Sequence, residues 1–358
     1  MNFNLEKLFV DVFAPAEEVV TIMYDLPTAK IPDNVEWKAR RKMADEWHKI
    51  ITGFAEKYKL KVNPVISYEA GGAHNMDLPE FGMCEGIIVN ITEMVSQTTI
   101  LLSMPEYSAS APLLILSQNK PDLRVASMPG LTKAMEKTGL AADYSKVAED
   151  CEKLAELFEQ AIGVEVHFST GHQCYFDISD NKIPLQDNGR LHKSNLSGGP
   201  RLRNLPSGEV CVAPNENPDS LTSGHLPIIQ NDHLLVLKVE QNKIIDVEGD
   251  SKEAKKQRKD FVKEPAMCNI AEVAVGCNDM ADVTGNLLED EKAGFHWAYG
   301  RSDHLQGKIG VKDFSSPEKV IHLDFVYAKG NPIICKKLEF IHPDGQKTLA
   351  IRDGQRLV

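Results

Sequence analysis

The first 163 residues alternate stretches of strand-like and helix-like hydrophobic pattern. EEVVTIMYDLP (17–27) predicts a buried strand that ends at a proline turn. Apolar residues recur at helical spacing over residues 34–60 and again over residues 144–163, where Gly163 is predicted to end the helix. Short apolar runs lie between these helices, in the segments CEGIIVNIT, TTILLSM, APLLILS and LRVASMPG. Strands that alternate with helices predict an open, at least partly parallel α/β sheet.

The pattern changes near residue 164, after which short strands and tight turns dominate. VEVHFSTGHQCYFDISDN (164–181) predicts two strands around a Ser-Thr-Gly turn, and LLVLKVEQNKIIDVEG (234–249) predicts a hairpin that turns at Gln-Asn-Lys. We therefore predict an N-terminal open α/β sheet domain over residues 1–163 and a C-terminal, mainly antiparallel α+β domain over residues 164–358. The segment 180–204, rich in Asn, Gly, Ser and Pro, is predicted to be a surface connection or an active-site loop of the second domain.

Composition and charge narrow the classes of function. The chain has 358 residues and a net charge of −12, which argues against a general nucleic-acid binder because phosphate binding needs clustered Lys and Arg. The basic runs KARRK (38–42) and KEAKKQRK (252–259) are flanked by acidic residues, so we expect solvated faces there. The seven cysteines are scattered and never spaced CxxC, as in reduced cytosolic proteins. No signal peptide or membrane span is predicted, and we expect a soluble, cytoplasmic protein with no membrane partner.

The stretch KVIHLDFVYAKG (319–330) predicts a half-buried strand with an unusual polar face. Ile321, Leu323, Phe325 and Tyr327 alternate as the apolar face, and the opposite face carries His322 and Asp324 between two valines. Residues i and i+2 of a strand point the same way, so the imidazole and the carboxylate can reach one common point. Such a pair suits a divalent transition metal, or it forms a buried hydrogen bond that helps the strand pack.

Three more polar residues are set into apolar sequence of the C-terminal half. Glu209 begins the run EVCVAP, Glu272 lies in the middle of CNIAEVAVGCN, and His296 follows a phenylalanine in GFHWAYG. A carboxylate in the middle of an aliphatic strand contradicts both strand propensity and burial. With His322 and Asp324, these residues form the set that a pair of divalent metals sharing carboxylates would require.

Other catalytic motifs are missing from the sequence. There is no GxGxxG, no Walker lysine and no HExxH, and the glycine pairs in AGGAH (70–74) and SGGPR (197–201) are read as loop glycines. No GxSxG elbow is present to support a serine hydrolase.

Four stretches together resemble the metallo-aminopeptidases of the aminopeptidase T/aminopeptidase S family, often described as leucyl aminopeptidases. They occur in the order of that family, and MPEYSASAPLLIL (104–116) and LRVASMPGLTKAM (123–135) resemble its N-terminal domain. The four stretches are NLPSGEVCVAP (204–214), IAEVAVG (270–276), HWAYG (296–300) and IHLD (321–324).

The resemblance implies a two-domain, dimeric metallo-hydrolase that removes N-terminal residues from small peptides. It implies a metal-bearing C-terminal domain and two divalent ions, expected to be Zn, Co or Mn. The ligands it implies are Glu209, Glu272, His296, His322 and Asp324.

One position departs from the family pattern. The family has a tyrosine a little beyond the first histidine, and that place holds Asp303 and His304 in this chain, while Tyr299 lies nearer to His296. The candidates for moving a proton to the leaving amine are Glu209, Glu272 and His304. The changed tyrosine position predicts weak or narrow peptidase activity.

A second enzyme class is compatible with the same residues. Ring-opening dioxygenases that act on dihydroxypyridines use a scaffold similar to these peptidases and bind one Fe(II) through two histidines and a carboxylate. His296, His322 and Asp324 would supply that facial triad for a small-molecule substrate. Retention of both glutamates favours the peptidase interpretation.

Overall fold

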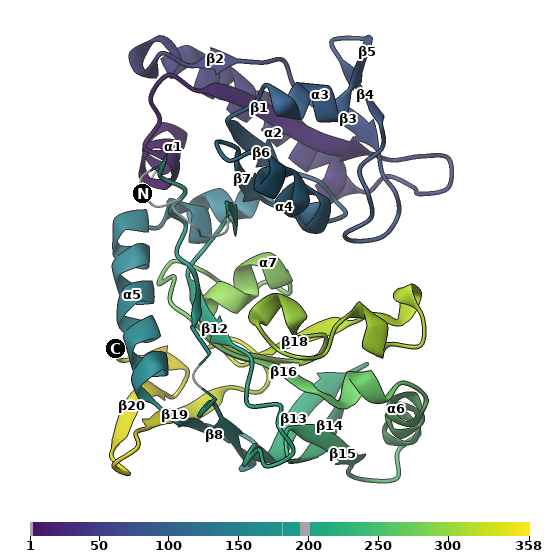
Figure 1. Ribbon diagram of the computed structural model, residues 1–358, viewed down its shortest axis with the longest axis vertical. Coiled ribbons are helices and arrows are strands. Elements are labelled where there is room, and N and C mark those ends of the chain that lie inside the picture. The colour runs from purple at the N-terminus through teal and green to yellow at the C-terminus, as the bar shows by residue number, and fades with distance from the viewer. Residues whose placement is uncertain (1–2, 181, 194–200) are drawn as a thin grey trace. The chain divides into compact units, whose positions relative to one another are not determined.

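A computed structural model of the chain describes residues 3–180, 182–193 and 201–358, and these divide into two compact units. Unit 1 comprises Met1–Ala148, Asp187–Ser207 and Asp279–Asp282, and unit 2 comprises Glu149–Gln186, Gly208–Asn278 and Val283–Val358. The predicted α/β class is confirmed: strands and helices alternate in unit 1, and antiparallel strands dominate unit 2 (Figure 1).

Unit 1 is a mixed sheet with helices packed on it. Over the described residues its strand order is β11-β7-β6-β1-β3-β4-β5, with β2 beside β1. The strands are β1 (Val19–Leu26), β2 (Lys61–Val62), β3 (Ile66–Glu69), β4 (Phe81–Cys84), β5 (Ile87–Asn90), β6 (Ile100–Ser103), β7 (Arg124–Ser127) and β11 (Leu202–Asn204). The helices are α1 (Leu5–Phe13), α2 (Val35–Phe54), α3 (Ile91–Ser96) and α4 (Ser110–Asn119), with 3₁₀ turns η1 (Glu56–Tyr58), η2 (Lys133–Lys137) and η3 (Gly139–Ala141).

The parallel part of this sheet agrees with the hydrophobic pattern. β1 pairs in parallel with β3 and β6, and β7 pairs in parallel with β6, whereas β4 and β5 add an antiparallel edge. The apolar run APLLILS lies within helix α4, whose Leu113 packs with Met23, Leu101 and Val125 of the sheet. An apolar run of that length has no periodicity that separates a strand from a buried helix.

The segment 180–204 lies only in part in its predicted place in the second domain, because it belongs to unit 2 up to Gln186 and to unit 1 from Asp187 onward. Its last residues form β11, which pairs in parallel with β7 and so extends the sheet of unit 1. In addition, α5 (Tyr144–Gln160) belongs to unit 2 from Glu149 onward, before the predicted boundary at residue 163. Residues 181 and 194–200 of the segment lie outside the described residues.

Unit 2 contains two mainly antiparallel sheets. Among the described residues, one has the order β10-β12-β16-β17-β18 and the other β15-β14-β13-β9-β8-β19-β20-β21. The first consists of β10 (Leu185–Asp187), β12 (Glu209–Val212), β16 (Ile270–Gly276), β17 (Phe295–Gly300) and β18 (His322–Val326). The second consists of β8 (Gly163–Phe168), β9 (Gln173–Asp177), β13 (Ser223–Gln230), β14 (His233–Glu240), β15 (Lys243–Val247), β19 (Cys335–Ile341), β20 (Lys347–Arg352) and β21 (Gln355–Arg356).

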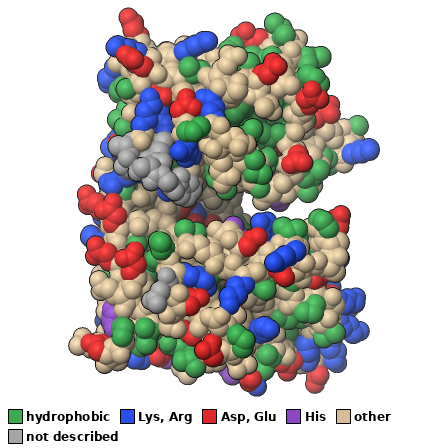
Figure 2. Space-filling view, viewed as in Figure 1, with side chains coloured by type: hydrophobic (Ala, Val, Ile, Leu, Met, Phe, Trp, Pro, Cys, Tyr) green, Lys and Arg blue, Asp and Glu red, His purple; other side chains and the backbone are tan. Residues whose placement is uncertain are grey.

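Helices and turns complete unit 2. They are α6 (Lys252–Lys263), α7 (Leu287–Asp290), η5 (Pro265–Cys268), η6 (Glu291–Ala293), η7 (Asp303–Leu305), η8 (Val311–Asp313) and η9 (Pro317–Lys319). The basic run 252–259 lies on α6, which buries Ala254, Gln257 and Phe261 and exposes its lysines, as the solvated-face prediction requires, while Arg258 is half-buried. Figure 2 shows this gathering of Lys and Arg side chains at the lower right. Among the described residues, no helix is both long and apolar enough to cross a membrane.

The two sheets of unit 2 pack through aromatic side chains. Phe295 of β17 lies 6.1 Å, ring to ring, from both Phe168 of β8 and Phe176 of β9, and Tyr327 lies 4.7 Å from Phe168. Successive side chains of a strand point to opposite faces. Since Phe295 faces the second sheet, the neighbouring His296 belongs to the opposite face of the first sheet.

Candidate metal centre

The five predicted ligands come from four neighbouring strands and share one face of the first sheet of unit 2. Residues directly opposite each other in paired strands point to the same face. Ala298 lies opposite both Glu272 and Asp324, which places those two carboxylates and His296 on a common face of β16, β17 and β18. The pairings of Gly276 with Glu209 and of Gly300 with His322 extend this face to all five residues.

Small residues beside the polar ones leave room for them. Ala298 stands between Glu272 and Asp324, Ala274 is opposite His296, and Gly300 is opposite His322. A Cβ on Gly276 would lie 2.3 Å from the carbonyl oxygen of Glu291, so only glycine permits the close approach of the 291–292 backbone. This local sequence explains how a buried face can hold five polar side chains.

The carboxylate of Glu272 lies between the two histidines. Its Oε1 is 3.8 Å from Nε2 of His296, and its Oε2 is 2.8 Å from Nε2 of His322. Each histidine has a second carboxylate neighbour: Nε2 of His296 is 3.3 Å from Oε2 of Glu209, and Nε2 of His322 is 3.3 Å from Oδ1 of Asp324. Two imidazole–carboxylate groups therefore share Glu272.

Backbone carbonyls orient both imidazole rings. Nδ1 of His322 lies 2.7 Å from the carbonyl oxygen of Arg301, and Nδ1 of His296 lies 3.3 Å from that of Gly294. A carbonyl oxygen only accepts, so Nδ1 carries the proton in each ring and the lone pair of the neutral ring is on Nε2. Both lone pairs face carboxylate oxygens, which are also acceptors. Each contact therefore requires an additional proton or a metal ion, and a carbonyl-oriented imidazole is the usual arrangement around a bound metal.

Two functional neighbours, Lys292 and Glu291, were missed by the sequence analysis. Nζ of Lys292 lies 2.6 Å from Oε1 of Glu209 and 3.2 Å from Oε2 of Glu291, and the lysine side chain is fully buried. Lysine and glutamate in the run EDEKAG are typical of a solvated turn, and the sequence held no periodic signal of their burial. The signal that could have identified them is their position directly before the His296 strand.

Opposing effects of burial and neighbouring charge shift the pKa values of these groups. Burial lowers the pKa of His296, but the contact with Glu209 outweighs it and raises that pKa to about 9. Burial also works against protonation of His322, yet Asp324 and Glu272 raise its pKa well above the ordinary range. Burial raises the pKa of Glu209, and Lys292 and His296 reverse that effect and lower it to about 2. These groups therefore form a cluster that attracts positive charge; it consists of the five predicted ligands with Glu291 and Lys292.

The charges and free acceptor atoms fit divalent metal ions. Four carboxylates and one ammonium give a net charge of −3 when they are ionised and the imidazoles are neutral. These five side chains are each at most 16% exposed, and they belong to Glu209, Glu272, Glu291, Asp324 and Lys292. Among the described residues, Oε2 of Glu209 is buried without a hydrogen bond. Imidazole nitrogens and carboxylate oxygens are the ligands that Zn and Mn take in proteins.

The most compact ligand group is Glu272, His322 and Asp324, whose ligand atoms all lie within 4.8 Å of one another. Within the described parts of the chain, no other group of three His, Cys, Asp or Glu residues meets this measure. The group contains two carboxylates and one histidine, and it does not include His296, which the predicted facial triad requires. His296 lies instead on the Glu209 side of Glu272.

The departure from the family tyrosine has a structural counterpart in the 301–308 loop. The rings of His304 and His322 are 4.7 Å apart and nearly perpendicular, so His304 borders the cluster. Desolvation and the neighbouring His322 lower the pKa of His304 to about 4, which keeps its imidazole neutral near pH 7. Asp303 turns to Arg301, with Oδ1 2.5 Å from Nε, and Tyr299 is a core aromatic 5.6 Å from the ring of Phe261.

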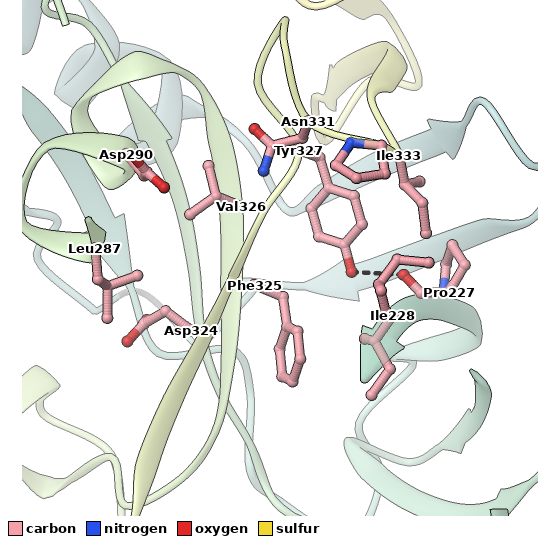
Figure 3. A pocket seen from close by; sticks show the side chains of 12 residues that line it. Pro227, Ile228, Leu287, Asp290, Asp324, Phe325, Val326, Tyr327, Asn331 and Ile333 are labelled. Carbon is pink, nitrogen blue, oxygen red and sulfur yellow. Dashed lines mark hydrogen bonds between the residues drawn. The ribbon is translucent and has the colours of Figure 1, made fainter. Parts of the chain in front are cut away.

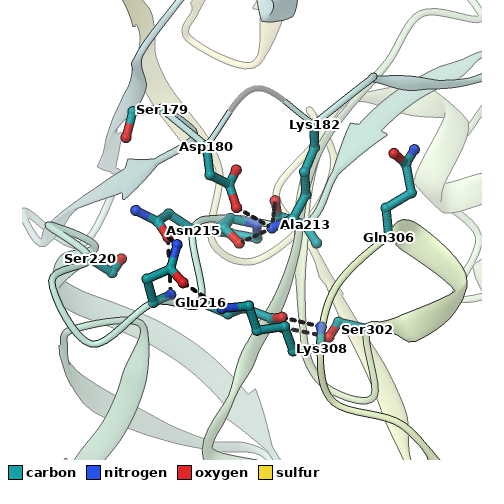
Figure 4. A network of polar contacts seen from close by, with 12 residues as sticks. Ser179, Asp180, Lys182, Ala213, Asn215, Glu216, Ser220, Ser302, Gln306 and Lys308 are labelled. Carbon is teal, nitrogen blue, oxygen red and sulfur yellow. Dashed lines mark hydrogen bonds and ion pairs between the residues drawn. The ribbon is translucent and has the colours of Figure 1, made fainter.

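A polar network holds this loop in place (Figure 4). Glu216, in the loop after β12, accepts a hydrogen bond from Ser302 at 2.5 Å and another from the backbone N–H of Lys308. The ammonium of Lys308 donates to Asn217 of the same loop. Residues 302 and 308 are thus fixed on either side of His304, which limits the positions that its imidazole can take beside His322.

Comparisons with known proteins show the fold of the chain. No protein-family model matches the sequence, and no curated protein matches it. The structure is similar to that of 2,5-dihydroxypyridine dioxygenase from Pseudomonas putida KT2440, with 14% identity and a TM-score of 0.62 over 100% of this chain and 98% of that one. It is also similar to wild-type AmpT, an aminopeptidase from Thermus thermophilus, with 16% identity and a TM-score of 0.59 over 99% and 98% of the two chains.

Both similarities extend over nearly the whole chain, but the two neighbours catalyse different kinds of reaction. One neighbour is a hydrolytic enzyme and the other an oxidative enzyme, at similarly low identity. At this level of identity, fold does not determine reaction. The chemistry has to be argued from the cluster itself.

Proposed function

We propose that this chain is a metal-dependent aminopeptidase-like hydrolase that removes N-terminal residues from small peptides. The observation that carries the proposal is the position of Glu272, whose two oxygens face the Nε2 atoms of His296 and His322. A carboxylate shared between two imidazole–carboxylate groups supports a two-metal hydrolytic site. The fold similarity to AmpT is compatible with this function.

Five residues would hold the metal ions: Glu209, Glu272, His296, His322 and Asp324. The ions, expected to be two of Zn, Co or Mn, would polarise the scissile carbonyl and lower the pKa of a bound water. Carbonyl groups of Gly294 and Arg301 keep the two imidazoles oriented for this task. Lys292 balances the charge of Glu209 and Glu291 without entering the ligand set.

Proton transfer to the leaving amine is assigned to His304. Its imidazole borders His322 and is neutral near pH 7. With a pKa of about 4 it is a weak base, but once protonated it is a strong acid toward the leaving amine. Glu209 and Glu272, the other candidates for this step, are both engaged with histidines or Lys292 and are better suited to hold metal. Asp303 and His304 stand at the place of the tyrosine in the aminopeptidase T/aminopeptidase S family, and this difference supports a narrow substrate range.

A ring-cleaving dioxygenase is the second candidate. The fold similarity to 2,5-dihydroxypyridine dioxygenase favours it, and His296, His322 and Asp324 would be the ligands of one Fe(II). The compact Glu272–His322–Asp324 group speaks against that triad, since it contains two carboxylates and only one of the histidines.

One experiment separates the two candidates. The chain, loaded in parallel with Zn, Mn, Co or Fe(II), is incubated with short peptides and with 2,5-dihydroxypyridine while oxygen consumption is recorded. We expect release of the N-terminal amino acid at the same rate with and without oxygen. Oxygen uptake with the ring substrate, together with intact peptides, would contradict the hydrolase assignment.

A further inference from the structure

Strand β18, which carries His322 and Asp324, is the edge of its sheet. In the strand order β10-β12-β16-β17-β18, among the described residues, β18 pairs with β17 on one side and with no strand on the other. An edge strand presents a row of unpaired N–H and C=O groups, and such rows bind extended chains in many proteins.

Two hydrogen bonds define which groups of β18 point away from the sheet. Tyr327 donates its N–H to the carbonyl of Phe295, and Ile321 accepts from the N–H of Arg301. In antiparallel pairing, alternate residues bond to the partner strand, so the odd-numbered residues of β18 face β17. The N–H and C=O groups of Asp324 and Val326 therefore face outward. Within the described part of the chain, these four groups make no hydrogen bond.

A pocket of about 210 Å³ runs along this free edge (Figure 3). Asp324 and Val326 of β18 line it together with Ile228 of β13, Leu287 of α7 and Ile333. Leu287 is 43% exposed, whereas Ile228 and Ile333 are buried in the wall. The pocket therefore offers apolar walls for side chains, free main-chain groups on one side and a candidate metal ligand, Asp324, in its lining.

We propose that the free edge of β18 binds the main chain of the peptide substrate as an added strand, with the residues after the N-terminal one lying in this pocket. The inference rests on the proposed aminopeptidase function and adds to it the mode of substrate binding. An extended peptide is the ligand whose alternating donors and acceptors match those of Asp324 and Val326. A planar ring has no such row of main-chain groups.

The direction of the bound chain follows from the two ends of β18. The metal ligands lie at the His322–Asp324 end, and the pocket extends past Val326 to Tyr327 and Ile333. A peptide with its N-terminus at the candidate metal centre therefore runs in the same direction as β18. In such a parallel pair, the N–H of Val326 donates to a peptide carbonyl, and the carbonyl of Asp324 accepts from a peptide N–H.

The first test uses the unaltered, metal-loaded protein and a tetrapeptide methylated at single amide nitrogens. Successive N–H groups of an added strand alternate between facing β18 and facing away. Two peptides are compared, one methylated at the amide nitrogen of the third residue and one at that of the fourth. Only one of the two should have a raised KM, by about threefold to tenfold, which is the effect of one lost hydrogen bond. Equal effects at both positions would overturn the inference.

The second test removes a donor from the protein. Val326→Pro deletes the outward N–H and leaves the bonds between β17 and β18 intact, since proline is tolerated at a free strand edge. We expect KM for the tetrapeptide to rise about threefold to tenfold relative to Val326→Ala, which loses the isopropyl group but keeps the N–H. Equal KM values in the two folded variants would contradict the assigned bond. If Val326→Pro does not fold, the methylated peptides alone decide.

A third readout does not depend on turnover. Hydrogen–deuterium exchange of the 322–328 segment is compared with and without a tetrapeptide analogue whose first peptide bond is replaced by CH₂–NH. Protection of the N–H groups of Asp324 and Val326 supports the inference, and unchanged exchange at saturating analogue overturns it. If the protein cleaves no peptide, the proposed function fails and the inference with it. Cleavage with no alternation and no protection overturns the inference alone.

Discussion

His296 and His322 turn their Nε2 atoms toward the two oxygens of one carboxylate, that of Glu272, at 3.8 Å and 2.8 Å. Both rings are oriented by backbone carbonyls at Nδ1, so the facing atoms are acceptors on both sides. Such facing acceptors stabilise the fold only when a proton or a metal ion lies between the imidazole nitrogen and the carboxylate oxygen.

Replacing His322 should remove metal without unfolding the chain. His322→Ala deletes a metal ligand, so metal affinity should fall at least tenfold. It also removes the imidazole between the buried carboxylates of Glu272 and Asp324, at a cost of about 3–5 kcal/mol of the free energy of unfolding of the metal-free protein. Elemental analysis and circular dichroism measure the two effects. His225→Ala, at a 40% exposed histidine paired with Glu248, is the matched control and should keep its metal. Unchanged metal content in His322→Ala would show that the ligand assignment is wrong.

Lys292 should be essential for the stability of the metal-free chain. Lys292→Met removes the buried ammonium that lies 2.6 Å from the carboxylate of Glu209, at a cost of about 3–5 kcal/mol of the free energy of unfolding. Added divalent metal should recover part of that loss, because it supplies positive charge to Glu209.

Lys347→Met is the control for this variant. Nζ of Lys347 is 2.7 Å from Glu165, but the lysine is 44% exposed, and exposed pairs contribute about 0–1 kcal/mol. Denaturant unfolding with and without metal measures both variants. Equal stabilities of Lys292→Met and Lys347→Met would contradict the role assigned to Lys292.

Stability and metal affinity should respond to pH in opposite directions. The pKa of His296 rises from 6.5 to about 9 in the folded, metal-free chain, so the imidazolium stabilises the fold fully below pH 6.5 and this contribution is lost as the pH rises to 9. Burial likewise raises the pKa of Glu291 to about 8, which adds to the loss of stability above pH 4.5. We expect the unfolding temperature of the metal-free protein to decrease as the pH is raised from 6.5 to 9.

Metal binding must displace the proton of His296, so affinity should increase by about tenfold per pH unit below pH 9 for each proton released. Competition with a chelator of known proton affinity measures the trend. An affinity for zinc that stays constant between pH 6 and pH 8 would show that these imidazoles do not bind the ion.

His304 should affect turnover and not metal binding. His304→Ala removes the proposed proton carrier and should lower kcat by about 10²–10⁴-fold, with the metal content unchanged. His342→Ala, at a histidine bonded to Thr348 at the β19–β20 turn, should retain kcat. Loss of a metal ion from His304→Ala would make His304 a ligand instead, and an unchanged kcat would leave the proton transfer to another group.

The polar residues on the strands of the cluster could be predicted from the sequence, whereas the groups that contact them could not. His322 and Asp324 were recognisable because strand alternation has a period of two, and Glu272 stood out because a carboxylate is rare in an aliphatic strand. Lys292 was not predictable, since a lysine between acidic residues is usually solvated. The carbonyls of Arg301 and Gly294 have no sequence signal, and the pairing of β11 with the sheet of unit 1 depends on long-range contacts.

Elemental analysis of the protein purified without chelator measures how many metal ions the chain holds, and of which element. If Glu209, Glu272, His296, His322 and Asp324 hold a shared hydrolytic centre, the chain should contain about two divalent ions, and Glu272→Gln should weaken the binding of both. A single iron per chain, with no second ion at saturating Zn, Co or Mn, would contradict the account.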